Sequence, residues 1–217
     1  MKQDLSIEIL IKEAALFSDT ESLHDEPALF GVTDGKAVGT YLEHKFIAHL
    51  MDNYSFAGGS SALGIDIPSI NVDIKVTSIK QPQSSCPFRS ARQKIYGLGY
   101  NLIVFVYDKT DDEKNRTGRL DMRHTIFVDK GRTADYQTTT GLRAILKNNG
   151  NTDDLVAFIQ DKNLPVDEIG AQALAEELLR NTPEEGYLTI SNALQWRLQY
   201  KRVITCANQI SGITRIR

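Results

Sequence analysis

Six consecutive apolar residues, Leu102–Tyr107 (LIVFVY), constrain the fold more than any other feature of the chain. A short run of β-branched and aromatic side chains is typical of a strand that is buried on both faces. Such a strand needs a covering layer on each side of its sheet. The run therefore predicts a central strand in a sheet that helices flank.

Hydrophobic periodicity and breaker residues divide the rest of the chain into helices, strands and loops. Helices are predicted over residues 2–17, 36–52, 90–98, 140–148, 152–161, 167–180 and 188–204. Two short strands joined by a turn at Pro68 are predicted within 60–78, a further strand over 125–128, and a charged surface loop over 108–119. This order indicates a mixed α/β (α+β) fold in which helices flank a central mixed sheet. We expect one domain over 1–217, with a catalytic core at about 36–130 and a helical C-terminal part at about 137–217.

Composition indicates an ordinary globular protein of the cytoplasm. Of the 217 residues, 41% are hydrophobic and 24% are charged, which is usual for a globular domain. The N-terminal stretch carries acids where a signal peptide needs basic and then apolar residues, and no run approaches a membrane span. Cys86 and Cys206 have no metal-ligand spacing. No Gly-x4-Gly-Lys-Ser/Thr loop occurs, so no nucleotide cofactor is expected.

Basic residues are concentrated in two stretches that contain no acid, although the net charge is −3. The stretches are 74–107 and 187–217, and each holds five Lys or Arg residues. They indicate a local phosphate-binding surface, and the alternative is chance clustering on solvated faces. The candidate DNA-contacting residues are Lys80, Gln81, Gln83, Ser84, Arg89, Arg92, Gln93, Lys94, Arg197, Lys201 and Arg202. The last three belong to a candidate DNA-facing stretch that includes Trp196, and the alternative is a helix packed by Trp196 whose basic residues are solvated.

The segment 66–75 carries the candidate chemistry. Alternation along a strand places Val72 and Ile74 on one face, and Asp73 and Lys75 together on the other. Asp66 precedes the turn, so a hairpin can bring its carboxylate beside that of Asp73. Two close carboxylates suit a divalent cation with oxygen ligands such as Mg²⁺, and a neighbouring ammonium can orient water or stabilise negative charge. The alternative is a polar edge strand with a surface ion pair.

Two blocks of the sequence resemble the PD-(D/E)xK nuclease superfamily, in particular its MutH-like group. One block runs from Lys36 to Glu43 and is similar to a helix with Gly-x-x-Leu-Glu. The other runs from Asp66 to Thr77 and is similar to an Asp-x-Pro…Glu-x-Lys-Thr block, with Asp73 where Glu is usual. The segment between the blocks is longer here and includes Gly58-Gly59-Ser60-Ser61.

The resemblance implies a restriction-endonuclease-like core and a set of site roles. It implies metal ligands at Asp66, Asp73, Ile74 and Glu43, and catalytic roles for Asp66, Asp73, Lys75 and Glu43. We expect a Mg²⁺-dependent type II restriction enzyme that cleaves specific sites in double-stranded DNA as a homodimer. The alternatives are a strand-nicking mismatch-repair endonuclease and a DNA-binding module without hydrolytic activity. Without the resemblance, Glu43 would be interpreted as an ordinary solvated helix residue.

Overall fold

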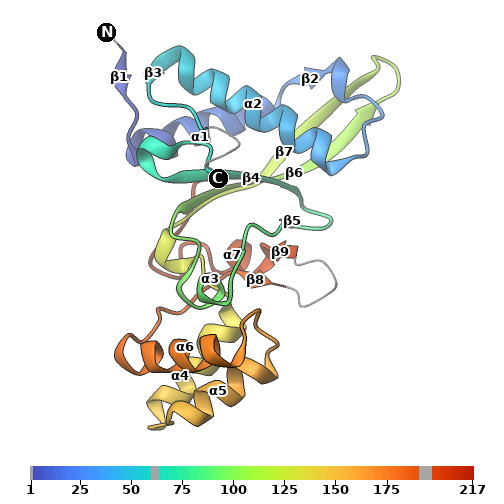
Figure 1. The fold of residues 1–217 in the computed structure, drawn as a ribbon. Helices are drawn as coiled ribbons and strands as arrows, with labels where there is room; N and C mark the ends of the chain where they lie inside the picture. The colour runs from blue at the N-terminus through green and yellow to red at the C-terminus, as the bar shows by residue number, and fades with distance from the viewer. Residues whose placement is uncertain (1, 60–63, 191–196) are drawn as a thin grey trace. The chain divides into compact units, whose positions relative to one another are not determined.

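A computed structural model describes residues 2–59, 64–190 and 197–217. The chain divides into two compact units. Unit 1 consists of residues 1–84, 101–128 and 203–217, and unit 2 consists of residues 85–100 and 129–202. The predicted mixed α/β fold with a central mixed sheet and flanking helices is confirmed (Figure 1).

The sheet of unit 1 mixes parallel and antiparallel neighbours. Its order is β10 (Ile213–Arg215), β7 (Thr117–Val128), β6 (Asn101–Asp112) and β4 (Val72–Ser78), and β2 (Asp25–Glu26) also pairs with β7. The pair β4–β6 is parallel, whereas β6–β7 and β7–β10 are antiparallel. A separate short parallel pair joins β1 (Gln3–Asp4) to β3 (Tyr54–Ser55). β4 therefore lies at the edge of the main sheet.

Strand β6 contains the predicted central strand, since every side chain of Leu102–Tyr107 is buried. The prediction of a surface loop over 108–119 was wrong. β6 continues to Asp112, β7 starts at Thr117, and the two form a long hairpin whose turn includes Arg116 at φ 52°. Residues 110–116 at the end of this hairpin are exposed and mostly polar or charged, so they lack the apolar alternation that indicates a strand.

Helices α1 (Ile7–Ser22) and α2 (Gly35–Asn53) cover one face of this sheet (Figure 1). Ser6 caps α1, and Asp34 caps α2 by accepting the N–H of Lys36, as predicted. The ring of Phe17 on α1 lies 4.9 Å from that of Phe46 on α2, and the ring of Phe46 lies 5.1 Å from that of Phe105 on β6. The ring of Phe17 also lies 5.9 Å from that of Phe105, so both helices pack directly on the sheet and the three rings meet at the centre of the core.

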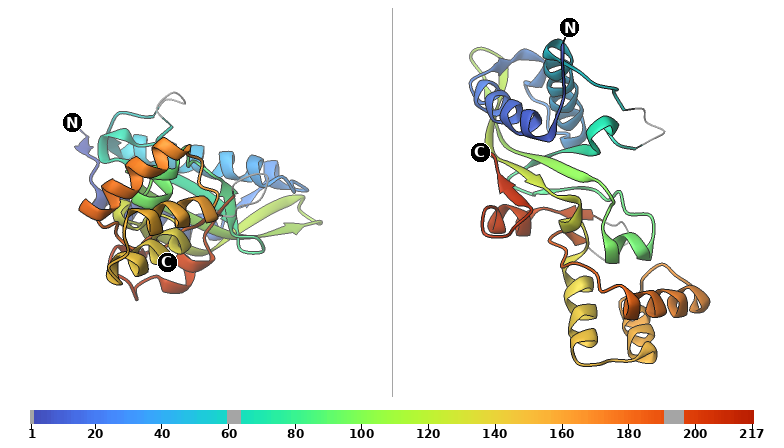
Figure 2. Two further views of the ribbon diagram at one scale, coloured as in Figure 1. Left: turned by 60° about the horizontal axis from the view of Figure 1, so that its bottom comes forward. Right: turned by 90° about the vertical axis from the view of Figure 1, so that its left-hand side faces the viewer.

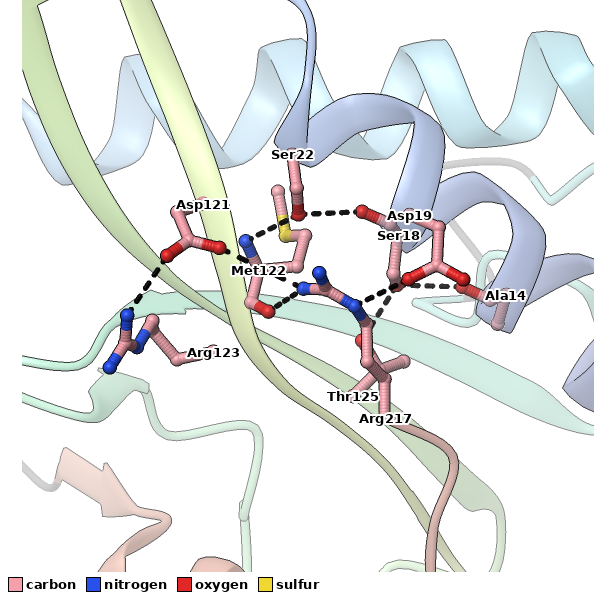
Figure 3. A network of polar contacts seen from close by, with 9 residues as sticks. All are labelled: Ala14, Ser18, Asp19, Ser22, Asp121, Met122, Arg123, Thr125 and Arg217. Atoms are coloured by element: carbon pink, nitrogen blue, oxygen red, sulfur yellow. Dashed lines mark hydrogen bonds and ion pairs between the residues drawn. The ribbon is translucent and has the colours of Figure 1, made fainter.

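Polar contacts also hold α1 against β7 and the end of the chain (Figure 3). The hydroxyls of Ser18 and Thr125 lie 2.7 Å apart in a buried position, and the hydroxyl of Ser22 accepts the N–H of Met122 at 2.9 Å. The guanidinium of Arg217 donates to the Asp19 carboxylate at 2.6 Å. The bonds of Ser18 and Ser22 satisfy polar groups that the α1–β7 interface buries, whereas the Arg217–Asp19 contact is exposed.

Unit 2 is mainly helical. It contains α3 (Ala91–Tyr96), α4 (Tyr136–Lys147), α5 (Thr152–Asp161) and α6 (Glu168–Arg180), together with the antiparallel pair β8 (Thr189–Ile190) and β9 (Arg197–Gln199). The last three helices lie side by side (Figure 2). They bury one apolar cluster that includes Leu142, Leu155 and Leu178. The helices predicted in this region are confirmed within a few residues at their ends.

The predicted helix over 188–204 was wrong. The described part of this range forms β8 and β9, and a helix begins only at Lys201, where α7 (Lys201–Cys206) starts. Residues 191–196, including Trp196, lie outside the described part of the chain, as do residues 60–63. Short elements fill the rest: the 3₁₀ turns Pro27–Leu29, Pro68–Ile70 and Lys130–Arg132, and strand β5 (Gln83–Ser85). No helix within the described ranges is long and apolar enough to cross a membrane.

Candidate active site

Strand β4 presents an acid and a lysine side by side. Val72 and Ile74 point into the core, with 0% and 1% of their surface exposed. The pleat turns Asp73 and Lys75 to the opposite face, where Lys75 Nζ lies 2.5 Å from Asp73 Oδ2. Asp73 is 4% exposed in its side chain and Lys75 is 22% exposed, so the carboxylate is covered while the ammonium reaches solvent.

A tight turn brings Asp66 to the same strand. Ile67 and Val72 form an antiparallel bridge, and the turn between them includes Asn71 in the left-handed region at φ 56°. Asp66 Oδ2 accepts the backbone N–H of Ile74 at 2.7 Å. The expected approach of Asp66 to the strand of Asp73 is therefore seen, but through a 3₁₀ turn rather than a second regular strand.

The backbone of Gly59 lies against the backbone of Asp66 and is hydrogen-bonded to it. Its N–H donates to the carbonyl of Asp66 at 2.9 Å. A Cβ atom at this position would lie 2.1 Å from the carbonyl oxygen of Ile65 and 2.8 Å from that of Asp66. Only glycine tolerates so close an approach of two backbone segments. Sequence reasoning noted Gly59 within a glycine–serine stretch and did not assign it this role.

Helix α2 contributes a third carboxylate. Burial raises the pKa of Glu43, the Asp66 carboxylate raises it further, and Lys75 acts in the opposite direction. Glu43 therefore lies within electrostatic reach of both residues, although it comes from the helix that covers the core face of the sheet.

The buried position of Asp73 makes its negative charge unfavourable. Burial raises the pKa of Asp73 to about 7, Lys75 opposes the rise, and the carboxylate of Asp66 adds to it. Asp73 Oδ2 accepts no well-aligned hydrogen bond from a described residue, although the Lys75 ammonium is close. A bound cation would stabilise the ionised form of Asp73, whose charge burial disfavours.

The donor set fits a hard divalent cation in its chemistry. Carboxylates of Asp66, Asp73 and Glu43 supply oxygen ligands, and Mg²⁺ prefers oxygen. The side chain of Ile74 is buried in the core, so this residue can offer only its backbone carbonyl. Within residues 2–59, 64–190 and 197–217, no three His, Cys, Asp or Glu side chains are already arranged as a ligand cluster. The carboxylates would therefore need to adjust around a cation.

The turn that follows β4 carries the first group of predicted DNA contacts. Lys80 and Gln81 are exposed, and Gln83 and Ser84 are half-buried. The turn is tight, because the N–H of Gln81 donates to the Ser78 carbonyl at 3.3 Å and the N–H of Gln83 donates to the Gln81 carbonyl at 2.8 Å. Two polar side chains therefore stand at the tip of a well-ordered turn.

Helix α3 of unit 2 differs from the expected basic surface. Arg89 is exposed, but Arg92 donates to Glu177 at 2.7 Å, which offsets its charge. The side-chain oxygen of Gln93 accepts a hydrogen bond from the backbone N–H of Arg89 at 2.6 Å, so this amide is engaged within the chain. The expectation of a solvent-facing Lys94 was wrong, because this side chain is 2% exposed.

Lys94 is instead part of the interior of unit 2. Burial lowers the pKa of Lys94, and the carboxylate of Asp135 partly restores it. Asp135 in turn accepts the N–H groups of Thr138 and Ile190, both at 2.9 Å, and so caps α4. Lys94 and Asp135 are both buried and lie within electrostatic reach of each other, which indicates a structural role for Lys94.

The third group, Arg197, Lys201 and Arg202, lies near the end of unit 2. Arg197 and Lys201 are exposed. The guanidinium of Arg202 stacks over the ring of Tyr136, 3.5 Å from its centroid, and its Nε is buried without a hydrogen-bond partner among described residues. Cation–π stacking fixes this guanidinium, so only part of it is open to a phosphate.

Comparison with known proteins places the whole chain in one family. The family described as "Type II restriction enzyme NspV" matches residues 4–215. The type II restriction enzyme NspV of Nostoc sp. (strain ATCC 29411 / PCC 7524) is 64% identical over 209 residues, which cover 96% of this chain and 95% of that protein. The chain belongs to the NspV family of type II restriction enzymes. No solved structure matches it.

Membership in the NspV family confirms the predicted class, a type II restriction endonuclease. It leaves the PD-(D/E)xK and MutH-like resemblance as predictions, together with the roles of individual residues. The structure adds Gly59 and Asn71 to the residues of this chain on which the geometry of the candidate site depends. Glycine in a Gly-Gly pair and asparagine after a Pro-Ser-Ile turn are signals of unusual backbone, but neither indicates which side chain the backbone positions.

Proposed function

We propose that the protein is a sequence-specific endonuclease that hydrolyses phosphodiester bonds in double-stranded DNA with a divalent cation, Mg²⁺. The observation that carries this proposal is the convergence of Asp73, Lys75 and Asp66 at one edge strand, with Glu43 in electrostatic contact. The name of the Nostoc relative, a type II restriction enzyme, supports the substrate class.

In this proposal the cation is held by the carboxylates of Asp66 and Asp73 and the backbone carbonyl of Ile74, with Glu43 close by. When bound, Mg²⁺ would offset the negative charge that develops on the phosphoryl group. Burial raises the pKa of both Asp73 and Glu43, and the carboxylate of Asp66 raises both further. The same cation would offset the repulsion among these carboxylates. The assignment corresponds to a PD-(D/E)xK site.

Lys75 is the residue placed to act on the reacting groups. Its ammonium is partly open to solvent and lies beside Asp73, so it can donate hydrogen bonds to the attacking water or to a phosphate oxygen. In the reaction a water oxygen bonds to phosphorus, and the bond from phosphorus to the leaving sugar oxygen breaks. The water proton is lost to solvent or to a neighbouring base, and the leaving oxygen takes up a proton.

Cleavage of both strands requires two sites or two successive events. We propose that two copies of the chain act as a homodimer, because symmetric pairing places one site on each strand. Lys80, Gln81 and the half-buried Gln83 and Ser84 would contact DNA beside the site. The exposed basic residues of unit 2, Arg89, Arg197 and Lys201, would contact phosphates, with Arg92, Gln93 and Arg202 more restricted by their partners.

The test is incubation with supercoiled plasmid and phage DNA in Mg²⁺, followed by sequencing of the DNA ends. The expected result is linear plasmid and discrete fragments whose ends share one sequence. Open circles alone would indicate strand nicking instead. Intact DNA, or a smear with random ends, would contradict the proposal.

A further inference from the structure

Thr77 lies on the same face of β4 as Asp73 and Lys75. Its side chain is 4% exposed, so its hydroxyl must find partners inside the protein. The hydroxyl accepts the N–H of Gln83 at 2.9 Å. It also lies 3.2 Å from the carbonyl of Gln81 and 3.0 Å from the carbonyl of Gln83, and can donate its single proton to either.

These bonds join the strand to the turn that follows it. The strand remains in the sheet as far as Ile79, whose N–H donates to the Tyr107 carbonyl at 2.8 Å. The hydroxyl of Ser78 accepts the N–H of Lys80 at 3.3 Å and adds a second tie. The backbone on both sides of Gln81 is therefore fixed from within, and its side chain stands exposed at the tip.

Distance along the strand relates this turn to the candidate catalytic pair. Four residues separate Asp73 from Thr77, which is about 13 Å in an extended strand. Base pairs in B-DNA rise about 3.4 Å each, so the same distance spans about four base pairs. The turn is therefore within reach of the bases of a short recognition site whose cut position lies at Asp73 and Lys75.

We infer that Thr77 is a positioning residue for specificity. It locks the turn 78–83 to the catalytic face so that the Gln81 amide meets a base edge in register with the bond to be cut. A glutamine amide suits adenine, to which it can both donate and accept hydrogen bonds. The inference rests on the proposed function, because it assigns a specificity role only if the protein cleaves DNA at a defined sequence.

The experiment compares cleavage of the mapped target with cleavage of duplexes that differ from it by one base pair. The measured quantity is discrimination, the ratio of kcat/KM for the target to kcat/KM for the altered duplex. Thr77→Val, which removes only the hydroxyl, should lower discrimination about tenfold at the base pair that Gln81 contacts, equivalent to about 1.4 kcal/mol. Thr77→Ser keeps the hydroxyl and should stay within about threefold of the wild type.

The matched control is Thr125→Val. Thr125 is also a buried strand threonine with a hydroxyl partner, Ser18, but it has no contact with the turn. This variant should lose stability and keep wild-type discrimination. In a double-mutant cycle, Thr77→Val should have no further effect once Gln81→Ala is present, because both act through one contact.

Three results would overturn the inference: wild-type discrimination in Thr77→Val, an equal loss in Thr125→Val, or full additivity with Gln81→Ala. If Thr77→Val does not fold, Gln81→Ala alone decides. This exposed substitution must lower discrimination, and unchanged discrimination rejects the role of the turn. A wild-type protein that cleaves nowhere would contradict the proposed function itself, which is a separate result visible before any variant is made.

Discussion

Replacing Asp73 by asparagine should make the metal-free protein more stable above neutral pH while abolishing cleavage. The carboxylate is buried, and burial raises the pKa of Asp73 to about 7 from its ordinary value of 3.8. Between these two values the folded protein holds a proton that the unfolded chain has lost. The contribution of Asp73 to stability is therefore largest at low pH and is lost as pH rises through 7.

The size of the effect follows from the shift. A rise of about 3 in the pKa, at about 1.4 kcal/mol for each unit, means that the ionised carboxylate lowers the free energy of unfolding by at most about 4 kcal/mol. Asp66 and Glu43 also repel one another in this site, and part of that repulsion persists in the variant. The net gain for Asp73→Asn above pH 8 should therefore be about 1–3 kcal/mol, or about 3–10 °C in Tm for a chain of this length.

Thermal unfolding in the presence of a chelator at pH 5 and pH 8.5 measures this. At pH 5 the folded wild type is protonated at Asp73. The difference in free energy of unfolding between the variant and the wild type should therefore be about 2–3 kcal/mol smaller than at pH 8.5. Asp111→Asn is the matched control, since Asp111 also pairs with a lysine two residues away on a strand, Lys109. It should give no gain. A variant Asp73→Asn that melts below the wild type at pH 8.5 would refute the reasoning.

Two further predictions test other parts of the structure. Gly59→Ala should reduce cleavage at least tenfold with DNA binding retained, because a Cβ would lie 2.1 Å from the Ile65 carbonyl oxygen and displace Asp66. Wild-type cleavage by this variant would contradict the close approach of the two backbone segments. The control is Gly35→Ala, whose Cβ would meet no neighbour. Lys94→Ala should lower the free energy of unfolding by about 2–4 kcal/mol without changing the salt dependence of DNA binding, because it leaves the Asp135 carboxylate buried without this cation. Lys80→Ala, at an exposed position, should reduce the slope of log DNA affinity against log salt concentration by about 1 and leave stability unchanged. If Lys94→Ala instead reduced this slope and left stability unchanged, Lys94 would be a DNA contact.

The parts of the fold that rest on local pattern could be predicted from the sequence. The run Leu102–Tyr107 fixed the buried strand, Asp34 marked the start of a helix, and the pleat placed Asp73 beside Lys75. Each of these depends on residues within one element. A strand period of two or a helix cap needs no knowledge of distant chain.

The parts that depend on distant contacts could not be predicted. The sequence predicts Lys94 as a surface residue of a basic helix, whereas in the structure it is buried and within electrostatic reach of Asp135, 41 residues later. The charged hairpin arms of β6 and β7 lack apolar alternation and were read as a loop. The role of Gly59 depends on a chain crossing at Ile65 and Asp66, which no local pattern records.

The central claim is that Asp66, Asp73 and Lys75 form the catalytic site. The most direct measurement is Mg²⁺-dependent cleavage of the mapped target, under single-turnover conditions, by Asp66→Ala, Asp73→Ala and Lys75→Ala. Lys109→Ala and Asp111→Ala are controls, because these residues form a similar ion pair on β6. The account predicts loss of cleavage by at least a thousandfold in the first three, with DNA binding largely intact, and wild-type cleavage in the controls. Unchanged cleavage in Asp73→Ala or Lys75→Ala would contradict it.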